Sequence, residues 1–384
     1  MNRQGKSNTS TGVAFCCSLF ALTLFLFPCT LRAQQLQGIV MDVEEGLPVR
    51  DVTVYLNGTT TGTISDTAGH FALFIRDFPA ELVFSHVSYG FQTLVIDSLP
   101  GTTLSVQLRP RPLQLEQVSV SEENQRKKNL RKFNRMFLGN DRWGRRARIV
   151  NEDDLSFLTD YGFTGKKRKK ELVLSFRVFA SAPLQIALPD LGYELRYDLV
   201  SFSSTRDTLS GRELLSTSGY CYFTSTAGSD PQKDKQLRRN RLAAYYNSPQ
   251  HFTRSLFSSD LEENGYRVYL ISDSLVDGHP YISHFKPDKC GCMIVGTDVA
   301  LLTGLKNQQL YVNYFGGYNG PINLNRAFYK LPYAKKSLVY ILHDPCPVRR
   351  NGTRPANSLS FSGSLGDKRI GATLPDDFDP DNVL

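Results

Sequence analysis

The sequence has 384 residues, a formal net charge of +8 and 41% hydrophobic residues. This length supports about two domains with cores of their own, so the fold does not depend on disulfide bonds although seven cysteines are present. No apolar stretch after Ala33 approaches the length of a membrane-spanning helix, which excludes a multi-spanning protein and favours a soluble or peripheral one.

The N-terminus has the layout of a secretory signal peptide. Arg3 and Lys6 form a short basic segment, residues 13–27 are almost all apolar, and Ala33 offers a small residue for cleavage. The apolar run is shorter than the roughly 18–20 residues that cross a bilayer, and an uncleaved anchor is the alternative. We expect removal of residues 1–33, export to the periplasm or cell surface, and a remaining formal charge of +5, because the leader holds three basic residues and no acidic one.

Residues 34–110 alternate apolar and polar side chains in short stretches separated by turn residues. Strands are predicted at residues 36–43, 52–57, 60–64, 70–75, 82–86, 93–96 and 103–108. Their close spacing, without a helical period between them, predicts a seven-stranded β-sandwich. Asp66 and Gly69 enclose a hairpin turn, because Asp can bond the turn backbone and Gly can take positive φ.

The same segment carries a recognisable order of residues. It contains Gly38-x-Val40-x-Asp42, Leu47-Pro48-Val49-x-Asp51-Val52-x-Val54, Gly62-Thr63-x-Ser65-Asp66-x-x-Gly69-x-Phe71 and Val87-Ser88-Tyr89-Gly90. This run resembles the carboxypeptidase-regulatory-like (transthyretin-like) domain found in many envelope proteins of Bacteroidota. The resemblance implies a transthyretin/prealbumin-like sandwich that binds or spaces other parts and has no chemistry of its own.

Residues 111–140 are predicted to form a linker that contains a helix. Ser121 followed by two acidic residues suits a helix N-terminus, and the Lys/Arg-rich run behind it suits the C-terminal half. Leu130, Phe133 and Phe137 fall on one face, which would dock against another part of the protein. The helix is expected over residues 122–138, with Gly139 as its C-cap.

Residues 141–384 are predicted to form an α+β domain of unknown function. Alternating stretches predict strands at residues 172–180, 192–202, 220–224, 266–272, 309–315, 337–343 and 359–362. Two helices are expected among them, at residues 233–246 and 249–264. The second helix begins with Ser248-Pro249 and is expected to end at Gly265. Helices inserted among antiparallel-type strands indicate this fold class.

Short segments of the second half, such as Leu191-Gly192-Tyr193 and Tyr245-Tyr246-x-Ser248-x-x-His251-Phe252-x-Arg254, are also familiar. They resemble an uncharacterised Bacteroidota group in which the regulatory-like module precedes a second domain of conserved length. The resemblance implies no known activity.

A histidine–cysteine segment, His279-x4-His284-x5-Cys290-Gly291-Cys292, offers ligand types that zinc or copper prefer. Its spacing matches no zinc motif, and Cys-x-Cys in an exported protein more often takes part in disulfides. We therefore expect no metal or other cofactor. A disulfide from Cys290 or Cys292 to Cys346 or Cys221 is expected, with unpaired thiols as the alternative.

Two places are candidates for ligand binding. His251 and Arg254 lie one helical turn apart and could face a single anionic group, although packing of the nearby aromatic residues explains the pattern as well. Tyr314, Tyr318 and Asn319 lie in a stretch of aromatics, amides and glycines, a composition typical of surfaces that hold sugar rings.

Basic residues cluster at residues 126–148, 166–170 and 238–241. Nucleic acid is not an expected partner, because the leader predicts export and aromatic residues are not interleaved with the lysine run. Anionic lipid headgroups, acidic glycans or an acidic protein are the remaining partners, with membrane contact at most peripheral. Solvated surfaces that serve solubility are the favoured interpretation.

Catalytic motifs are absent from the sequence. It contains no Gly-x-Ser-x-Gly, phosphate loop, His-Glu-x-x-His or dinucleotide fingerprint, and no histidine has Glu three residues on. We expect a non-enzymatic envelope protein that binds or scaffolds another envelope protein or a glycan through its second domain. The alternative is an unrecognised periplasmic hydrolase of peptides or glycans, metal-dependent or not.

Overall fold

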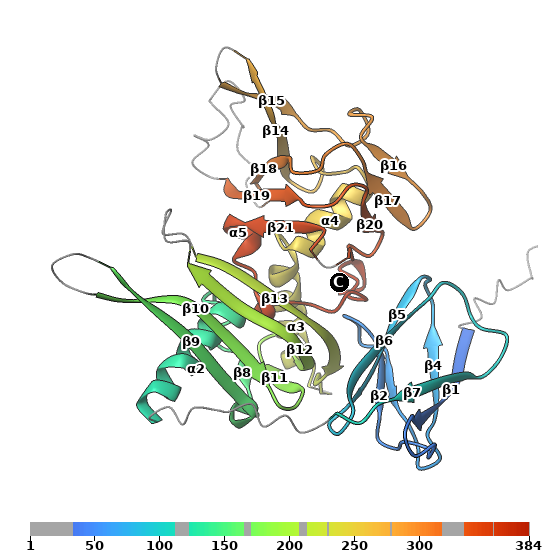
Figure 1. Cartoon of the computed structure of the whole chain (residues 1–384). Helices are drawn as coiled ribbons and strands as arrows, with labels where there is room; N and C mark the ends of the chain where they lie inside the picture. The colour runs from blue at the N-terminus through green and yellow to red at the C-terminus, as the bar shows by residue number, and fades with distance from the viewer. Residues whose placement is uncertain are drawn as a thin grey trace, which may run out of the picture.

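The computed structural model describes residues 34–111, 123–164, 170–206, 213–228, 230–276, 279–316, 334–355 and 357–383. These residues build three parts, each with its own hydrophobic core. The parts are a β-sandwich (34–111), a middle lobe (123–245 together with 370–383) and a distal lobe (249–366) (Figure 1). The expected leader, residues 1–33, lies outside the described residues.

The β-sandwich consists of β1 (Gln34–Asp42), β2 (Thr53–Leu56), β3 (Gly62–Ile64), β4 (His70–Ile75), β5 (Ala80–His86), β6 (Gly90–Ile96) and β7 (Leu104–Leu108). One sheet has the order β4-β1-β7 and the other β3-β2-β5-β6. β4 alternates exposed and buried residues with period two, as its sequence predicted. At the hairpin before it, Oδ1 of Asp66 accepts from two backbone N–H groups and Gly69 has a φ of 74°. The expected seven-stranded sandwich is confirmed.

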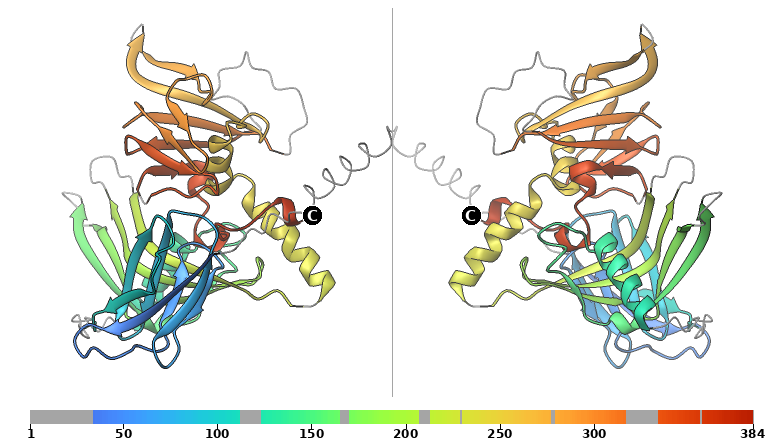
Figure 2. Two further views of the ribbon diagram at one scale, coloured as in Figure 1. Left: turned by 90° about the vertical axis from the view of Figure 1, so that its right-hand side faces the viewer. Right: turned by 90° about the vertical axis from the view of Figure 1, so that its left-hand side faces the viewer.

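The middle lobe comprises α2 (Glu123–Phe137), β8 (Arg148–Ile149), β9 (Leu155–Thr164), β10 (Lys170–Ala180), β11 (Leu184–Leu188), β12 (Tyr193–Arg206), β13 (Glu213–Ser225) and α3 (Pro231–Tyr245). Strand β12 pairs with β13 along one edge, and with β11 and then β10 along the other. α3 projects from the molecule (Figure 2).

Helix α2 packs on this sheet and is part of the lobe's core. Phe133 meets Phe202 with ring centroids 4.8 Å apart, and Phe137 meets Tyr197 at 5.2 Å. The predicted apolar face therefore docks as expected, but the helix belongs to the lobe that follows it and is not a free linker.

The distal lobe comprises α4 (Pro249–Phe257), β14 (Tyr266–Val276), β15 (His279–His284), β16 (Met293–Val295), β17 (Val299–Leu302), β18 (Gln309–Tyr314), β19 (Lys335–Ile341), β20 (Cys346–Arg349), β21 (Leu359–Ser362) and α5 (Gly363–Gly366). Its sheets have the orders β15-β14-β18-β19-β21 and β16-β17-β20. The predicted α+β character is confirmed, but the second half of the chain contains two cores where the sequence predicted one domain.

Helix α4 ends earlier than expected. It stops at Phe257, and Ser259 takes a left-handed conformation with φ of 59° that a continuing helix cannot contain. The chain then turns through residues 261–265, where Gly265 has a φ of 81°, and enters β14. The prediction that α4 ends at Gly265 was therefore wrong. The turn at residues 261–265 places Glu262 and Asn264 at the site described below.

The sandwich is fixed to the middle lobe through the end of its β2–β3 hairpin. The backbone N–H of Gly58 donates to the carbonyl of Cys221 at 2.8 Å, and Thr59 accepts from Phe223 at 3.0 Å. These bonds extend the edge of β13 with a short parallel bridge. Because backbone hydrogen bonds cross the boundary, the two parts are joined by structure as well as by the linker.

The C-terminal segment, residues 370–383, crosses between all three parts (Figure 1). Gly371 donates to the carbonyl of Leu138 in the middle lobe, at 2.9 Å. Asp376 donates from its backbone N–H to the carbonyl of Gly58 in the sandwich, at 2.7 Å. The last residues of the chain thus join elements that are far apart in sequence, and we call residues 370–383 the C-terminal clasp.

Candidate functional site

His251 lies in the first turn of α4. The Ser248 hydroxyl accepts a hydrogen bond from the His251 backbone N–H, and Pro249 occupies the first helical position. Asn247 precedes this cap in a left-handed conformation with φ of 56°. The local geometry turns the imidazole inward, where only 2% of the residue is exposed.

Both ring nitrogens of His251 have partners. Nδ1 accepts from the backbone N–H of Asn247 at 3.2 Å and lies 2.9 Å from the Tyr266 hydroxyl. Because Nδ1 accepts, Nε2 carries the hydrogen and donates to Oδ1 of Asn264 at 3.3 Å. Burial lowers the pKa of His251 to about 4, although the Asn264 hydrogen bond opposes this shift. The ring is therefore neutral at pH 7, and its lone pair is already used inside the protein.

Four tyrosine rings surround this imidazole. The ring centroids of Tyr245, Tyr266, Tyr246 and Tyr314 lie 4.9, 5.2, 5.3 and 6.0 Å from that of His251. Three of the tyrosines are buried, whereas Tyr246 is 48% exposed. His251 is thus the centre of a cage of four tyrosine rings, and Tyr246 is the member of that cage that is exposed to solvent.

A cleft of about 720 Å³ lies beside the cage. The end of α3, the turn before β14, the end of β18 and the start of β19 form its walls. The side chains with chemistry to offer are Tyr246, Glu262, Glu263, Asn264, Arg267, Tyr314 and Lys335. The cleft combines aromatic surface, one amide and charges of both signs, which suits a polar ligand that carries a ring.

The charges on one wall of the cleft are paired with each other. Glu262 lies 3.1 Å from Lys286, 3.4 Å from His284 and 3.8 Å from Arg267. Burial alone would raise the pKa of Glu262, but the Lys286 hydrogen bond and the nearby cations outweigh it and hold the pKa below its ordinary value. This wall therefore presents a fixed carboxylate whose position is set by three basic neighbours.

Arg254 does not share a site with His251. Its Nε donates to the carbonyl of Asn351 at 2.8 Å, and its Nη2 donates to the carbonyls of Asp376 and Phe378, each at 2.9 Å. The guanidinium therefore uses its hydrogen-bond donors to hold the C-terminal segment and the loop at Asn351. The expectation that His251 and Arg254 face one anionic group is wrong, because three backbone carbonyls already take up the Arg254 guanidinium, although both side chains also contact the Tyr245 ring.

The other candidate residues divide between described and undescribed parts. Tyr314 lines the cleft and contacts the His251 cage, so the structure brings together two residues that the sequence suggested separately. Tyr318 and Asn319 lie outside the described residues. Sequence reasoning missed Tyr246, Asn264, Arg267 and Lys335 as cleft residues, since nothing in their local pattern distinguishes them from ordinary surface side chains.

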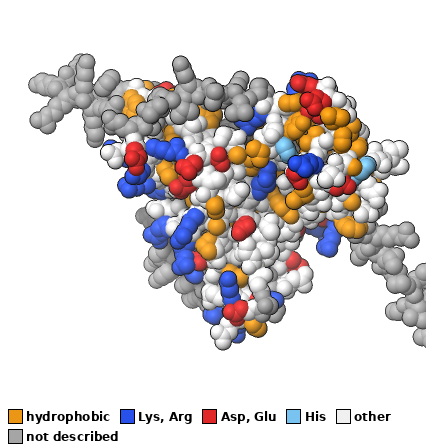
Figure 3. Space-filling model, turned by 90° about the horizontal axis from the view of Figure 1, so that it is seen from below, with side chains coloured by type: hydrophobic (Ala, Val, Ile, Leu, Met, Phe, Trp, Pro, Cys, Tyr) orange, Lys and Arg blue, Asp and Glu red, His pale blue; other side chains and the backbone are white. Residues whose placement is uncertain are grey.

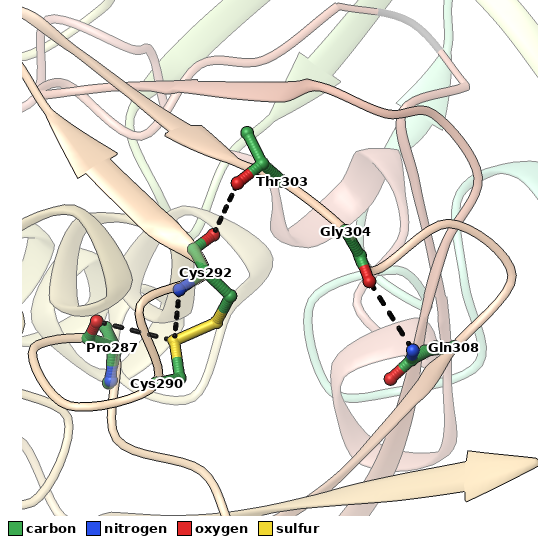
Figure 4. Close-up of a disulfide and its surroundings, with 6 residues drawn as sticks. All are labelled: Pro287, Cys290, Cys292, Thr303, Gly304 and Gln308. Atoms are coloured by element: carbon green, nitrogen blue, oxygen red, sulfur yellow. Dashed lines mark hydrogen bonds between the residues drawn. A yellow bond between two sulfur atoms is a disulfide. The ribbon is translucent and has the colours of Figure 1, made fainter. Parts of the chain in front are cut away.

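The cysteines pair differently from the expectation. Cys290 and Cys292 form a disulfide with each other (Figure 4). Cys221 and Cys346 are free. Burial raises the pKa of the Cys346 thiol, and that of Cys221 is also raised by burial. The predicted link to Cys346 or Cys221 is therefore wrong, because Cys290 and Cys292 are already joined to each other and Cys346 is buried in the core of the distal lobe. Within the described ranges, no cluster of three or more metal-ligating side chains occurs.

The sandwich is the part for which a relationship to known proteins can be stated. Its two sheets, its hairpin at Asp66–Gly69 and its seven strands are those expected from the pattern of residues 34–110. Residues 36–120 match the CarboxypepD_reg-like domain family. The match runs ten residues past the boundary expected at residue 110. No curated protein matches the chain.

The CarboxypepD_reg-like domain does not contribute to the cleft. Its contacts with the rest of the protein include β2, β5, β6 and the hairpin at residues 57–60, which reach β12, β13 and the C-terminal segment. The cleft is built by residues 243–335 of the two lobes. The candidate site therefore belongs to the second half of the chain, and the CarboxypepD_reg-like domain is attached to the middle lobe.

Proposed function

We propose that the protein is an exported, non-catalytic envelope protein that binds a glycan in the cleft between α3 and β14. The observation that carries the proposal is the half-exposed ring of Tyr246 at a cleft that is also lined by a fixed carboxylate, Glu262, and by Asn264, whose amide is held in place by bonds to His251 and to the Asp260 carbonyl. An aromatic face beside hydrogen-bonding groups is how proteins commonly hold sugar rings. The CarboxypepD_reg-like domain serves as an accessory part, rigidly joined to the binding lobes.

The state of His251 supports binding over catalysis. A general acid or base needs a pKa near the working pH and a proton within reach of substrate. His251 has a pKa lowered to about 4 and donates to Asn264, so it acts by ordering the tyrosines and the amide beside the cleft. The ring is a positioning residue for the cleft wall.

Export rests on the leader pattern of residues 1–33. The helices in the described part of the chain all lack the length and apolar character of a membrane-spanning helix. Cell fractionation tests this element of the proposal: a shortened chain in the envelope or medium is expected. Recovery of the full-length chain from the cytosol would overturn it.

Binding is tested with the purified chain on an array of envelope polysaccharides, followed by titration of the best ligand. Tyr246→Ala is expected to weaken binding by about fivefold, because a stacked ring contributes on the order of 1 kcal/mol. Phe74→Ala is the matched control, since Phe74 is a 55% exposed aromatic on β4 of the sandwich. No glycan bound above background, or equal losses in both variants, would reject the cleft.

The non-enzymatic part of the proposal has a separate test. The same purified chain is incubated with peptide and glycan substrates, and the products are analysed by mass spectrometry. No turnover is expected. Hydrolysis that a single substitution in the cleft abolishes would show that the hydrolase alternative is correct.

A further inference from the structure

Helix α2 turns a line of positive charges toward solvent. The 15-residue helix contains six basic residues and one acidic residue, Glu123. Asn129, Phe133 and Phe137 form its buried face. Lys128, Arg131 and Arg135 are exposed and follow at spacings of three and four residues on the opposite face. We call these three residues the basic ridge.

The other cations of α2 are held by the protein. Arg126 donates to the carbonyls of Leu155 and Glu152, at 2.8 and 2.9 Å. Lys127 pairs with Glu123 at 2.6 Å, and Lys132 lies 4.5 Å from the centre of the Phe176 ring. The basic ridge differs from them, because its side chains make no ion pair and no hydrogen bond within the described ranges.

The like charges of the basic ridge lower the stability of helix α2. Lys127 and Arg131, Lys128 and Arg131, and Arg131 and Arg135 are like charges at i,i+3 or i,i+4. Each such pair destabilises a helix slightly, and an acidic residue at these positions would stabilise it instead. A surface that serves solubility alone works equally well with mixed signs, so the uniform sign favours an external anionic partner.

The charge is local. Residues 123–148 hold ten basic side chains and two acidic ones, an excess of eight that equals the formal charge of the whole chain. Arg145 and Arg148, which follow α2, are also exposed and make no ion pair within the described residues. Seen from below, Lys and Arg side chains are numerous on the half of the molecule away from the sandwich (Figure 3).

We propose that the basic ridge of α2 is a docking surface for the anionic headgroups of a lipid bilayer. The ridge spans about 10 Å from Lys128 to Arg135 along a convex helix, and this distance is close to the screening length at physiological salt. A convex line of cations without neighbouring aromatics fits a flat anionic surface better than a discrete ligand. The protein then lies on the membrane with α2 parallel to it, and none of the three ridge residues lines the cleft.

The test is co-sedimentation of the full chain with vesicles of phosphatidylcholine, with and without phosphatidylglycerol. Binding is expected only to the anionic vesicles and is expected to disappear at high salt. Each Lys or Arg near such a surface contributes about fivefold in affinity, so Lys128→Gln/Arg131→Gln/Arg135→Gln should lose on the order of 100-fold.

Two control variants locate the effect. Lys233→Gln/Lys235→Gln/Arg239→Gln removes the same charge from exposed positions on α3 and should bind nearly as well as the natural protein. Lys128→Arg/Arg131→Lys/Arg135→Lys keeps the charge and should bind fully. Far-UV circular dichroism checks that every variant is folded.

Three results would overturn the proposal. The first is no binding to anionic vesicles at low salt. The second is an equal loss in the α2 and α3 variants, which would mean that net charge alone acts. The third is binding of an acidic polysaccharide without binding of vesicles, which would make the ridge a glycan surface. Each result leaves the glycan proposal for the cleft to be judged by Tyr246→Ala alone.

Discussion

The hydroxyl of Tyr55 on β2 donates to Oδ2 of Asp198 on β12 across 2.6 Å. The other oxygen of the same carboxylate accepts from Ser85 on β5, also at 2.6 Å. Only 4% of Asp198 is exposed, and Arg196 lies 3.9 Å away. One buried carboxylate of the middle lobe is thus satisfied by two hydroxyls of the CarboxypepD_reg-like domain, so the two parts are built to stay together.

This contact predicts a specific loss of stability. Asp198→Ala should cost about 3 kcal/mol, because the substitution leaves two hydroxyls and Arg196 without their buried acceptor. Tyr55→Phe should cost about 1–2 kcal/mol, because it removes one donor and keeps the packing. Urea unfolding measures both. Ser201→Ala, at an exposed position of the same β12 strand, is the control and should change little. If all three variants had the same free energy of unfolding, the hydrogen bonds of Tyr55 and Ser85 to Asp198 would not be what holds the two parts together.

Asp376 makes stability depend on pH. Burial raises the pKa of this carboxyl to about 7, while Arg254, Arg354 and Arg349 oppose the rise and Asp377 adds to it. The folded state then holds its proton at pH values where the unfolded chain, with a pKa near 3.8, has released it. Stability therefore falls as pH rises from about 4 through about 7.

Asp376→Asn tests this directly. The variant should be more stable than the natural protein at pH 8 and nearly equal to it at pH 4. About 4 kcal/mol is the upper limit from three pKa units, and the half-buried side chain keeps the gain smaller. Cys221 is the neighbouring thiol, and Cys221→Ser checks that it does not cause the effect. A difference between Asp376→Asn and the natural protein that is the same at both pH values would contradict the assignment.

The lowered pKa of His251 predicts the opposite dependence of stability on pH. Its pKa is about 4 in the folded state against 6.5 in the unfolded chain, so the folded state resists protonation. The stability that this gives is complete above pH 6.5 and is lost as pH falls through 4, by up to about 3 kcal/mol. His251→Gln should be less stable at pH 7 but should lack this acid slope. The measurement is the unfolding midpoint of both proteins at pH 7, 5.5 and 4. The same dependence of the midpoint on pH in the natural protein and in His251→Gln would contradict the prediction.

Arg254 should control the order of the C-terminal clasp. Arg254→Gln removes donors from the carbonyls of Asn351, Asp376 and Phe378 and should cost about 2 kcal/mol. Backbone amides near Asp376 should exchange faster with solvent, and proteases should cut residues 375–383 more readily. Arg238→Gln, which breaks only an exposed pair with Asp234, serves as the control. Unchanged exchange at the clasp would show that Arg254 does not hold it.

Much of the fold could be predicted because its signals are local. The seven sandwich strands follow from period-two alternation, and α4 begins at the predicted cap, Ser248 followed by Pro249, whereas α3 begins at Pro231, two residues before its predicted start. The strands that were missed are β8, β9, β11, β15, β16, β17 and β20, because short or weakly alternating strands are stabilised by their neighbours in the sheet and not by their own sequence. Among site residues, only His251 and Tyr314 were anticipated and then found together.

The sequence by itself determined the segments that alternate, the helix starts, the leader pattern and the family of the first domain, since these depend on residues close together in the chain. Only the tertiary structure decided that α2 belongs to the middle lobe, that Cys290 pairs with Cys292 and that Arg254 holds the chain end. It also set the pKa of Asp376 and His251. Except at the Cys290–Cys292 disulfide, which joins residues two apart, burial and charge at those positions come mainly from partners distant in the sequence, and no local pattern records which partners will meet.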